Sequence, residues 1–187
     1  MPPEVFRLQG DHFAKDLFVI PESIDILISD RRDKKMFTVY EMFFDKETIP
    51  EAKVECDIFE SRFAESYMEL YNRAFHPMRE ALGIRPYDWY SDISAIKAKS
   101  DDIYLLTEGD ELIGSVACYG NEIDDLFVNE KYLMKGYGRQ MLYWAMNYLR
   151  GKGYKEIVLH VAEWNDHALK MYLDAGFEIR KKEQINV

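Results

Sequence analysis

Three carboxylates and one tyrosine have the residue types and spacing that acid–base chemistry requires. Glu122, Asp124 and Asp125 stand together within one short stretch, and Tyr172 follows much further along the chain. A carboxylate can accept the proton of an attacking amine, and a tyrosine hydroxyl can donate a proton to a leaving group. Each side chain also has a purely structural explanation, as a solvated strand carboxylate or a core aromatic. The segments around them therefore decide the interpretation.

A glycine loop lies between the carboxylates and the tyrosine. Val128 ends an apolar run, and Gly136 and Gly138 begin an expected helix. Helix N-termini bind anions through unpaired N–H groups and the helix dipole, and glycines let a phosphate approach those amides. From Lys131 to Lys155 the sequence has six basic residues and no acidic one, although the formal net charge of the chain is −10. The loop therefore indicates a phosphate site, and a plain turn before a solvated helix is the alternative.

A second pattern lies directly after an apolar strand further along the chain. Asn165, Ala168 and Tyr172 are spaced three and four residues apart, and Gly176-Phe177 follows them. This spacing puts the three side chains on one face of a short helix, which Asn165 can cap.

Together the two segments resemble the GNAT family of acetyltransferases. That family has a Q/R-x-x-G-x-G/A cofactor motif, which Gly136 and Gly138 match, while Leu133 stands in place of the Gln or Arg. It also has an N-x-x-A-x-x-x-Y-x-x-x-G-F pattern, which the residues from Asn165 to Phe177 match. The departure at Leu133 loses a side chain and no backbone amide, so phosphate binding by the loop is still expected.

The resemblance implies that acetyl-CoA is the acyl donor and that a splay beside the strand from Glu122 to Val128 admits its pantetheine arm. It implies Tyr172 as the proton donor and Glu122 as the base, with Asp124 as a second candidate. Glu122 and Asp124 would share a strand face with Leu126 and Val128 if no bulge interrupts the strand, and a water relay in place of a single base stays open. The residues expected to bind the cofactor are Phe127, Val128, Lys135, Gly136, Tyr137, Gly138, Arg139, Asn165, Ala168 and Tyr172.

The resemblance also implies an α/β (α+β) fold, with a central mixed, mostly antiparallel twisted sheet flanked by helices. Residues 36–187 would form the acyltransferase domain, and residues 1–35 a strand-containing N-terminal extension. Pro77 is expected to end or kink the first helix near His76. Hydrophobic periodicity predicts strands at Met36 to Phe44, Ile103 to Thr107, Leu112 to Tyr119, Glu122 to Val128 and Ile157 to Val161, a closing strand from Phe177, and helices from about Asp57 to Phe75, Tyr87 to Lys99, Gly136 to Arg150 and Asn165 to Asp174.

One strand of the family's sheet has no counterpart at the end of this chain. The family usually inserts a last strand between its fifth and sixth, and the chain ends soon after the strand that begins at Phe177. We expect an N-terminal segment, from this chain or a partner, to cover the exposed strand edges. Alternatively it forms part of the acceptor site, with Tyr87, Trp89 and Tyr90 lining a pocket, although core packing explains these aromatics equally well.

Composition limits the other functions. The net charge of −10 disfavours nucleic acid and anionic membranes as partners. Cys56 and Cys118 form no disulfide framework, and no secretory or membrane-spanning run occurs, so a cytoplasmic protein is expected. The four histidines are scattered, so no metal is expected, and His160 and His167 are interpreted as structural or solvent-facing. A homodimer stays open.

The leading hypothesis is an N-acetyltransferase that transfers acetyl from acetyl-CoA to a primary amine of a small molecule or peptide. The alternative is a non-catalytic acyl-CoA-binding sensor or regulatory module. Tyr172 and the strand carboxylates favour the enzyme, while Leu133 favours the sensor. A nucleotide-binding module is disfavoured because neither G-x-x-x-x-G-K-[ST] nor G-x-G-x-x-G occurs.

Overall fold

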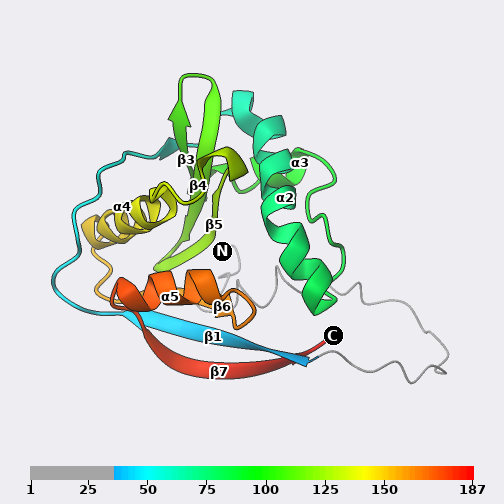
Figure 1. Cartoon of the computed structure of the whole chain (residues 1–187). Coiled ribbons are helices and arrows are strands. Elements are labelled where there is room, and N and C mark those ends of the chain that lie inside the picture. The colour runs from blue at the N-terminus through cyan, green and yellow to red at the C-terminus, as the bar shows by residue number, and fades with distance from the viewer. Residues whose placement is uncertain (1–35) are drawn as a thin grey trace, which may run out of the picture. The chain divides into compact units, whose positions relative to one another are not determined.

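Residues 36–187, the part of the chain that the computed structural model describes, fold into a mixed sheet with helices on both faces (Figure 1). Its elements are β1 (Met36–Phe44), β2 (Asp57–Ile58), the 3-10 turn η1 (Ser61–Phe63), α2 (Ala64–Leu82), α3 (Ser94–Lys97), η2 (Ser100–Asp102), β3 (Ile103–Glu108), β4 (Glu111–Tyr119), β5 (Glu122–Val128), η3 (Glu130–Tyr132), α4 (Tyr137–Gly151), β6 (Ile157–Ala162), α5 (Asp166–Asp174) and β7 (Glu178–Asn186).

The sheet has seven strands in the order β2-β3-β4-β5-β6-β1-β7. Within residues 36–187, β5 and β6 are its one parallel pair, and the other neighbours run antiparallel. The parallel pair follows from the crossover through α4, since a strand-helix-strand connection returns the chain in the same direction. The predicted mixed, mostly antiparallel sheet flanked by helices is confirmed.

Each face of the sheet has its own apolar core. One core lies under α4 and α5 and includes Met141, Leu142 and Tyr172. The other lies under α2 and includes Tyr67, Tyr71 and Phe127. Figure 1 shows α4 and α2 on opposite sides of strands β3 to β5. The two cores fix both helices against β5, the strand that carries the candidate base.

Strand β1 occupies the sheet position that the sequence left vacant. It pairs antiparallel with β6 on one side and with β7 on the other. No strand follows β7 in the described residues, as expected, but the strand from Met36 to Phe44 fills the gap between β6 and β7, so that place in the sheet is not empty. Residues 1–35, which we expected to cover strand edges, lie outside the described residues. The sheet ends in β7, whose mostly exposed, charge-rich sequence makes its free edge a poor template for further strand pairing.

Two helix predictions need correction. Helix α2 continues through Pro77 to Leu82, where Gly83 at φ 80° caps it, so Pro77 does not end the helix. The helix expected from Tyr87 to Lys99 is limited to α3. The Asn72 side chain explains the loss of its first part, since it bonds both the backbone N–H and the backbone C=O of Tyr90. These bonds hold the segment before α3 against α2 in place of helical bonds.

Strand β1 carries a matched pair of methionines that tests its position in the core. Met42 is fully buried, whereas Met36 is 59% exposed. We expect Met42→Ala to lower the free energy of unfolding by about 2–4 kcal/mol, because it leaves a cavity between two strands and a helix layer. Met36→Ala should change it by less than about 0.5 kcal/mol. Urea denaturation measures both, and equal effects would contradict an interior β1.

Candidate active site

Strands β5 and β6 separate after a short pairing. They pair only at Glu122 with Val158 and at Ile123 with Leu159, although β5 continues to Val128. Beyond Ile123, the β5 edge that faces β6 has no strand partner among the described residues. The predicted splay beside this strand is therefore present. It leaves backbone N–H and C=O groups that an extended ligand could pair with.

A β-bulge causes the separation. The register between β4 and β5 shifts between Ser115 and Ala117, which pair with Phe127 and Asp124. Asp125 within the bulge has φ 47°, an uncommon conformation for a non-glycine residue. Its own neighbours hold it there, since Asp124 Oδ1 accepts its backbone N–H at 2.7 Å and the Tyr71 hydroxyl donates to its Oδ1 at 2.9 Å. Such bulges re-aim side chains and bend a strand away from its partner.

The bulge also changes which side chains share a face of β5. Asp124 pairs with Ala117, a residue of the core under α2. Leu126 and Val128 pack with the core under α4 instead, and both lie near Gly138. The expectation that Glu122 and Asp124 share their face with Leu126 and Val128 is wrong, because the extra residue in the bulge reverses the alternation. The carboxylates thus face α2, while the predicted phosphate loop lies on the α4 side.

The predicted phosphate loop begins helix α4 as expected. Gly136 is the residue before the helix and has φ 87°, and Met134 also lies in the left-handed region at φ 59°. The first backbone bond into the helix runs from the Gln140 N–H to the Gly136 carbonyl at 3.2 Å. The amides of Tyr137, Gly138 and Arg139 precede that bond, so they are available to an anion at the positive end of the helix dipole.

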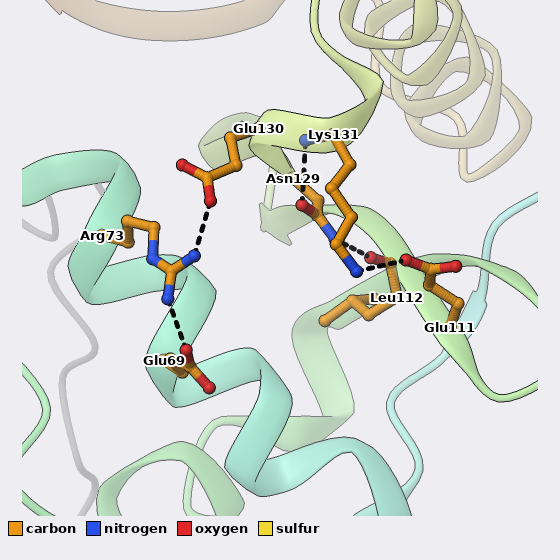
Figure 2. Close-up of polar contacts among 7 residues, drawn as sticks. All are labelled: Glu69, Arg73, Glu111, Leu112, Asn129, Glu130 and Lys131. Atoms are coloured by element: carbon orange, nitrogen blue, oxygen red, sulfur yellow. Dashed lines mark hydrogen bonds and ion pairs between the residues drawn. The ribbon is translucent and has the colours of Figure 1, made fainter.

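Side-chain contacts fix the entrance to this loop at Asn129 (Figure 2). The Asn129 Nδ2 donates to the Leu112 carbonyl at 3.0 Å, and its Oδ1 accepts the Lys131 N–H at 3.2 Å. Because Asn129 is buried, these bonds satisfy polar groups that would otherwise destabilise the fold. Figure 2 also shows ion pairs from Glu130 to Arg73 on α2 and from Lys131 to Glu111 on β4. The loop is thus tied to both of its neighbours.

The basic residues around the loop have different contacts. Lys131 pairs with Glu111 at 3.1 Å, and Arg139 pairs with Asp174 at 3.2 Å. The Arg139 pair is about half exposed, and such pairs are weak enough to exchange for a phosphate. Lys135 is exposed and lies over the Tyr132 ring at 4.7 Å. Among the predicted cofactor residues, Lys135 and Arg139 therefore present positive charge beside the helix start.

The second sequence pattern forms helix α5 with the expected cap. Asn165 precedes the helix, and its Oδ1 accepts the Ala168 N–H at 3.1 Å. The cap commits Oδ1, which leaves the Asn165 Nδ2 as the side-chain group that could reach a ligand. Ala168 is partly buried against the core under α4, and Tyr172 is 8% exposed. The three side chains thus lie along the α5 surface that borders the splay.

Two ionisable groups near the splay have shifted pKa values. Burial, and then the charges of Asp125 and Glu122, raise the pKa of Asp124 well above its ordinary value. Burial raises the pKa of Tyr172, and the Asp124 charge adds to that shift. Tyr172 therefore keeps its proton at neutral pH, and Asp124 lies within electrostatic range of it. These two predicted residues therefore interact electrostatically, although they lie on opposite sides of the sheet.

Glu122 has a different neighbour, which the sequence did not reveal. The His160 Nδ1 lies 2.7 Å from the Glu122 Oε1, and the His160 Nε2 lies 3.8 Å from a Glu41 oxygen. His160 was interpreted as structural or solvent-facing, yet its side chain is only 18% exposed and contacts the first base candidate. The apolar run around His160 gave no signal of this, because the contact depends on the β5–β6–β1 strand order.

The aromatics at the end of α2 also differ in their roles. Tyr90 is buried and packs against Tyr71 with ring centroids 4.7 Å apart, so core packing accounts for it. Tyr87 and Trp89 are partly exposed. Trp89 stacks on the guanidinium of Arg79, whose carbon lies 4.8 Å from the ring centroid. Nothing in the sequence pointed to Arg79, because an arginine on a helix usually faces solvent.

Comparison with known proteins identifies the family. Residues 64–177 match the model of the Acetyltransferase (GNAT) family, and the chain belongs to that family. Among solved structures, an acetyltransferase of the GNAT family from Colwellia psychrerythraea matches with a TM-score of 0.62 and 10% identity, over 82% of this chain and 57% of that one. A GCN5-related N-acetyltransferase from Sphaerobacter thermophilus matches with a TM-score of 0.51 and 17% identity, over 82% of this chain and 52% of that one. These likenesses establish the fold.

The curated relatives are longer proteins than this chain. The mycothiol acetyltransferase of Corynebacterium efficiens is 26% identical over 124 residues, which are 64% of this chain and 42% of that protein. The mycothiol acetyltransferase of Corynebacterium glutamicum is 22% identical over 149 residues, which are 74% of this chain and 48% of that protein. The chain therefore spans less than half the length of each of these relatives.

The described residues show neither a metal-binding cluster nor a membrane-spanning helix. Residues 36–187 contain no cluster of three or more His, Cys, Asp or Glu side chains that could hold a metal ion. No helix in the same part of the chain is long and apolar enough to span a membrane.

The two loop glycines form a matched pair for testing the loop conformation. We expect Gly136→Ala to lower the free energy of unfolding by about 1 kcal/mol, because Gly136 has φ 87°. Gly138→Ala should be close to neutral, because the new Cβ would meet its nearest atom at 3.5 Å in ordinary contact. Urea denaturation of both variants measures the difference. If Gly136→Ala is as stable as the wild type, the left-handed start of α4 is wrong.

The raised pKa of Asp124 predicts a pH-dependent stability effect. Between the unfolded and the folded pKa, the folded protein holds a proton that the unfolded chain has released, so stability falls as the pH rises through this range. Asn cannot ionise and keeps the Oδ1 acceptor. We therefore expect Asp124→Asn to gain stability relative to the wild type from about pH 4 upward.

Thermal unfolding between pH 4 and pH 8 measures this gain. Asp45→Asn is the control, because Asp45 is exposed. A difference between Asp124→Asn and wild type that stays constant over this pH range would contradict a raised pKa at Asp124.

Proposed function

We propose that this protein is an acetyl-CoA-dependent N-acetyltransferase that acts on a primary amine of a small molecule or peptide. The observation that carries the proposal is the splay between β5 and β6, which begins after Ile123, next to Asp124, whose charge acts on Tyr172. Membership of the Acetyltransferase (GNAT) family supports acetyl transfer, since that family uses acetyl-CoA as its donor. Residues 36–187 would supply the acyltransferase domain, with residues 1–35 as an extension.

The donor-binding residues fit the chemistry of coenzyme A. The free amides at the start of α4, with Lys135 and Arg139 beside them, suit a pyrophosphate. The unpaired β5 edge at Phe127 and Val128 suits the amide groups of a pantetheine arm, as an added strand would pair with it. The Asn165 Nδ2 offers a donor on the opposite wall, and the small side chain of Ala168 leaves room there. Bound acetyl-CoA would supply an activated thioester carbonyl.

Direct attack by the amine requires one proton acceptor and one proton donor. As the amine nitrogen bonds to the acetyl carbon and the carbon–sulfur bond breaks, the amine loses a proton and the thiolate gains one. We assign proton acceptance to Asp124, because its raised pKa matches that task and its charge reaches Tyr172. Glu122 would assist from the same strand face, oriented by His160. Tyr172, protonated at neutral pH, would donate to the thiolate.

Mycothiol-type acceptors are one option within this proposal. The curated relatives are named for mycothiol acetylation. Their similarity supports acetyl transfer to an amine, but the matched part covers under half of each relative. Acceptor-binding loops vary independently of the fold, so the acceptor must be argued from the residues of this chain.

Removal of the Tyr172 hydroxyl tests the proposed chemistry. We expect Tyr172→Phe to lower kcat by about 100-fold or more while the Kd for CoA stays within about two-fold of the wild-type value, because the hydroxyl acts on the leaving thiolate. Thiol release with an amine panel measures kcat, and calorimetry with CoA measures Kd. Tyr154→Phe is the control, because Tyr154 is 37% exposed and lies after α4.

Two outcomes would contradict this proposal. Thiol release that is unchanged in Tyr172→Phe would remove Tyr172 as the acid. If the wild-type protein binds CoA but acetylates no amine, the acyl-CoA sensor becomes the better interpretation.

A further inference from the structure

A buried cation lies outside the catalytic machinery described above. Arg79 on α2 is only 2% exposed. Its Nε and Nη1 atoms are buried and donate to no acceptor in the part of the chain that the structure describes. A guanidinium does not lose its proton in proteins, so this charge cannot neutralise itself. Buried polar groups are almost always hydrogen-bonded, and an uncompensated buried charge is strongly destabilising. These buried donors therefore suit an anion as the binding partner of Arg79.

Three acidic residues close to Arg79 in the sequence have other partners. Asp88 lies 2.8 Å from the His76 Nδ1, and Glu80 lies 4.0 Å from the His76 Nε2. Asp92 accepts the N–H of Ser94 at 2.7 Å. The Arg79 guanidinium lies over the Trp89 ring in a cation–π contact. This contact attracts the cation but supplies no hydrogen-bond acceptor. The fold thus holds the guanidinium in place without supplying its counter-ion.

Tyr71 connects Arg79 to the proposed catalytic carboxylates. Its hydroxyl donates to the Asp125 Oδ1 at 2.9 Å, and Asp125 follows Asp124 in the β5 bulge. Burial and the Asp125 charge raise the pKa of Tyr71, while the Arg79 charge lowers it. Tyr71 therefore lies within electrostatic range of both groups. The positive charge of Arg79 and the carboxyl groups of Asp124 and Asp125 thus border the same aromatic cluster under α2.

Such a separation of charge is complementary to a molecule that carries both an amine and an acid. We propose that Arg79 binds the carboxylate of the acceptor, so that the acceptor is an amino acid or a short peptide with a free C-terminus. Its amine would lie toward Asp124, and its carboxylate would accept a hydrogen bond from an unpartnered donor of Arg79. A hydrogen bond from a guanidinium to a carboxylate is charge-assisted and therefore stronger than a neutral one. Trp89, which is partly exposed, is the ring that such a ligand would displace.

This assignment rests on the proposed acetyl transfer, and it adds the acceptor class. The experiment compares acceptors that differ in one group. Free amino acids and dipeptides are each assayed beside their C-terminal amides, and aminoalkylphosphonates form a third arm. The variant is Arg79→Gln. Arg85→Gln is the control, because Arg85 is exposed and stacks on Tyr87 in the following loop.

The expected result is a change in selectivity. In wild type, kcat/KM for the carboxylates should exceed that for the amides by about 10-fold or more, since charge-assisted bonds are worth about that factor. Arg79→Gln should remove this preference and leave the amides within about two-fold, and Arg85→Gln should keep it. A wild type without the preference, a preference that survives in Arg79→Gln, or a preference for phosphonates over carboxylates would overturn the assignment.

Binding without turnover gives an independent readout. Thermal unfolding is measured with the same acids and amides in the absence of acetyl-CoA. Stabilisation by the acids alone, lost in Arg79→Gln, supports the carboxylate site even if no amine is acetylated. Equal effects of acids and amides overturn it, even if acetylation is observed. If Arg79→Gln does not fold, Arg79→Lys replaces it, because Lys keeps the charge and lacks the planar fork, and a reduced acid preference is again expected.

Discussion

Strand β5 remains paired with β6 for only two residue pairs, and most of the candidate site depends on that early separation. The bulge at Asp125 bends β5 away from its neighbour and leaves a backbone edge that has no strand partner within residues 36–187. The same bulge directs the carboxylates toward α2 and the residues after it toward α4. A regular strand would close the sheet at this point and would put Asp124 on the same side as Leu126 and Val128. One extra residue thus creates both the opening and the division of its two walls.

Four long strand pairs, β3–β4, β4–β5, β1–β6 and β1–β7, hold the sheet together around this opening. Strand β1 fills the position between β6 and β7 and contributes fully buried side chains such as Met42. The chain therefore completes the sheet with a strand from before α2, in a place where the family usually has a strand from the end of the chain. Strand β1 also brings Glu41 to His160, which in turn contacts Glu122. The replacement of that strand thus reaches the side chain of a base candidate.

Charge is separated between the two faces of the sheet. On the α4 side, the helix start and its basic neighbours form a positive region in an acidic protein, as a phosphate-bearing donor requires. On the α2 side lie the carboxyl groups of Asp124 and Asp125 and the buried guanidinium of Arg79. Donor and acceptor would thus approach the splay from opposite faces, each matched by the charges it meets. The aromatic cluster of Tyr71, Tyr90 and Phe127 sets the spacing on the acceptor side.

The sequence alone determined the parts of this protein that depend on neighbouring residues. Alternating and helical periodicity predicted β3 to β6, α4 and α5 to within a residue or two, and short motifs predicted the helix start at the glycine loop and the Asn165 cap. Three features needed the tertiary structure, because each joins segments far apart in the chain. They are the place of β1 in the sheet, the contact of Glu122 with His160, and the burial of Arg79 beneath Trp89. The bulge belongs with them, since Tyr71, from α2, binds the side chain of Asp125, which has φ 47°.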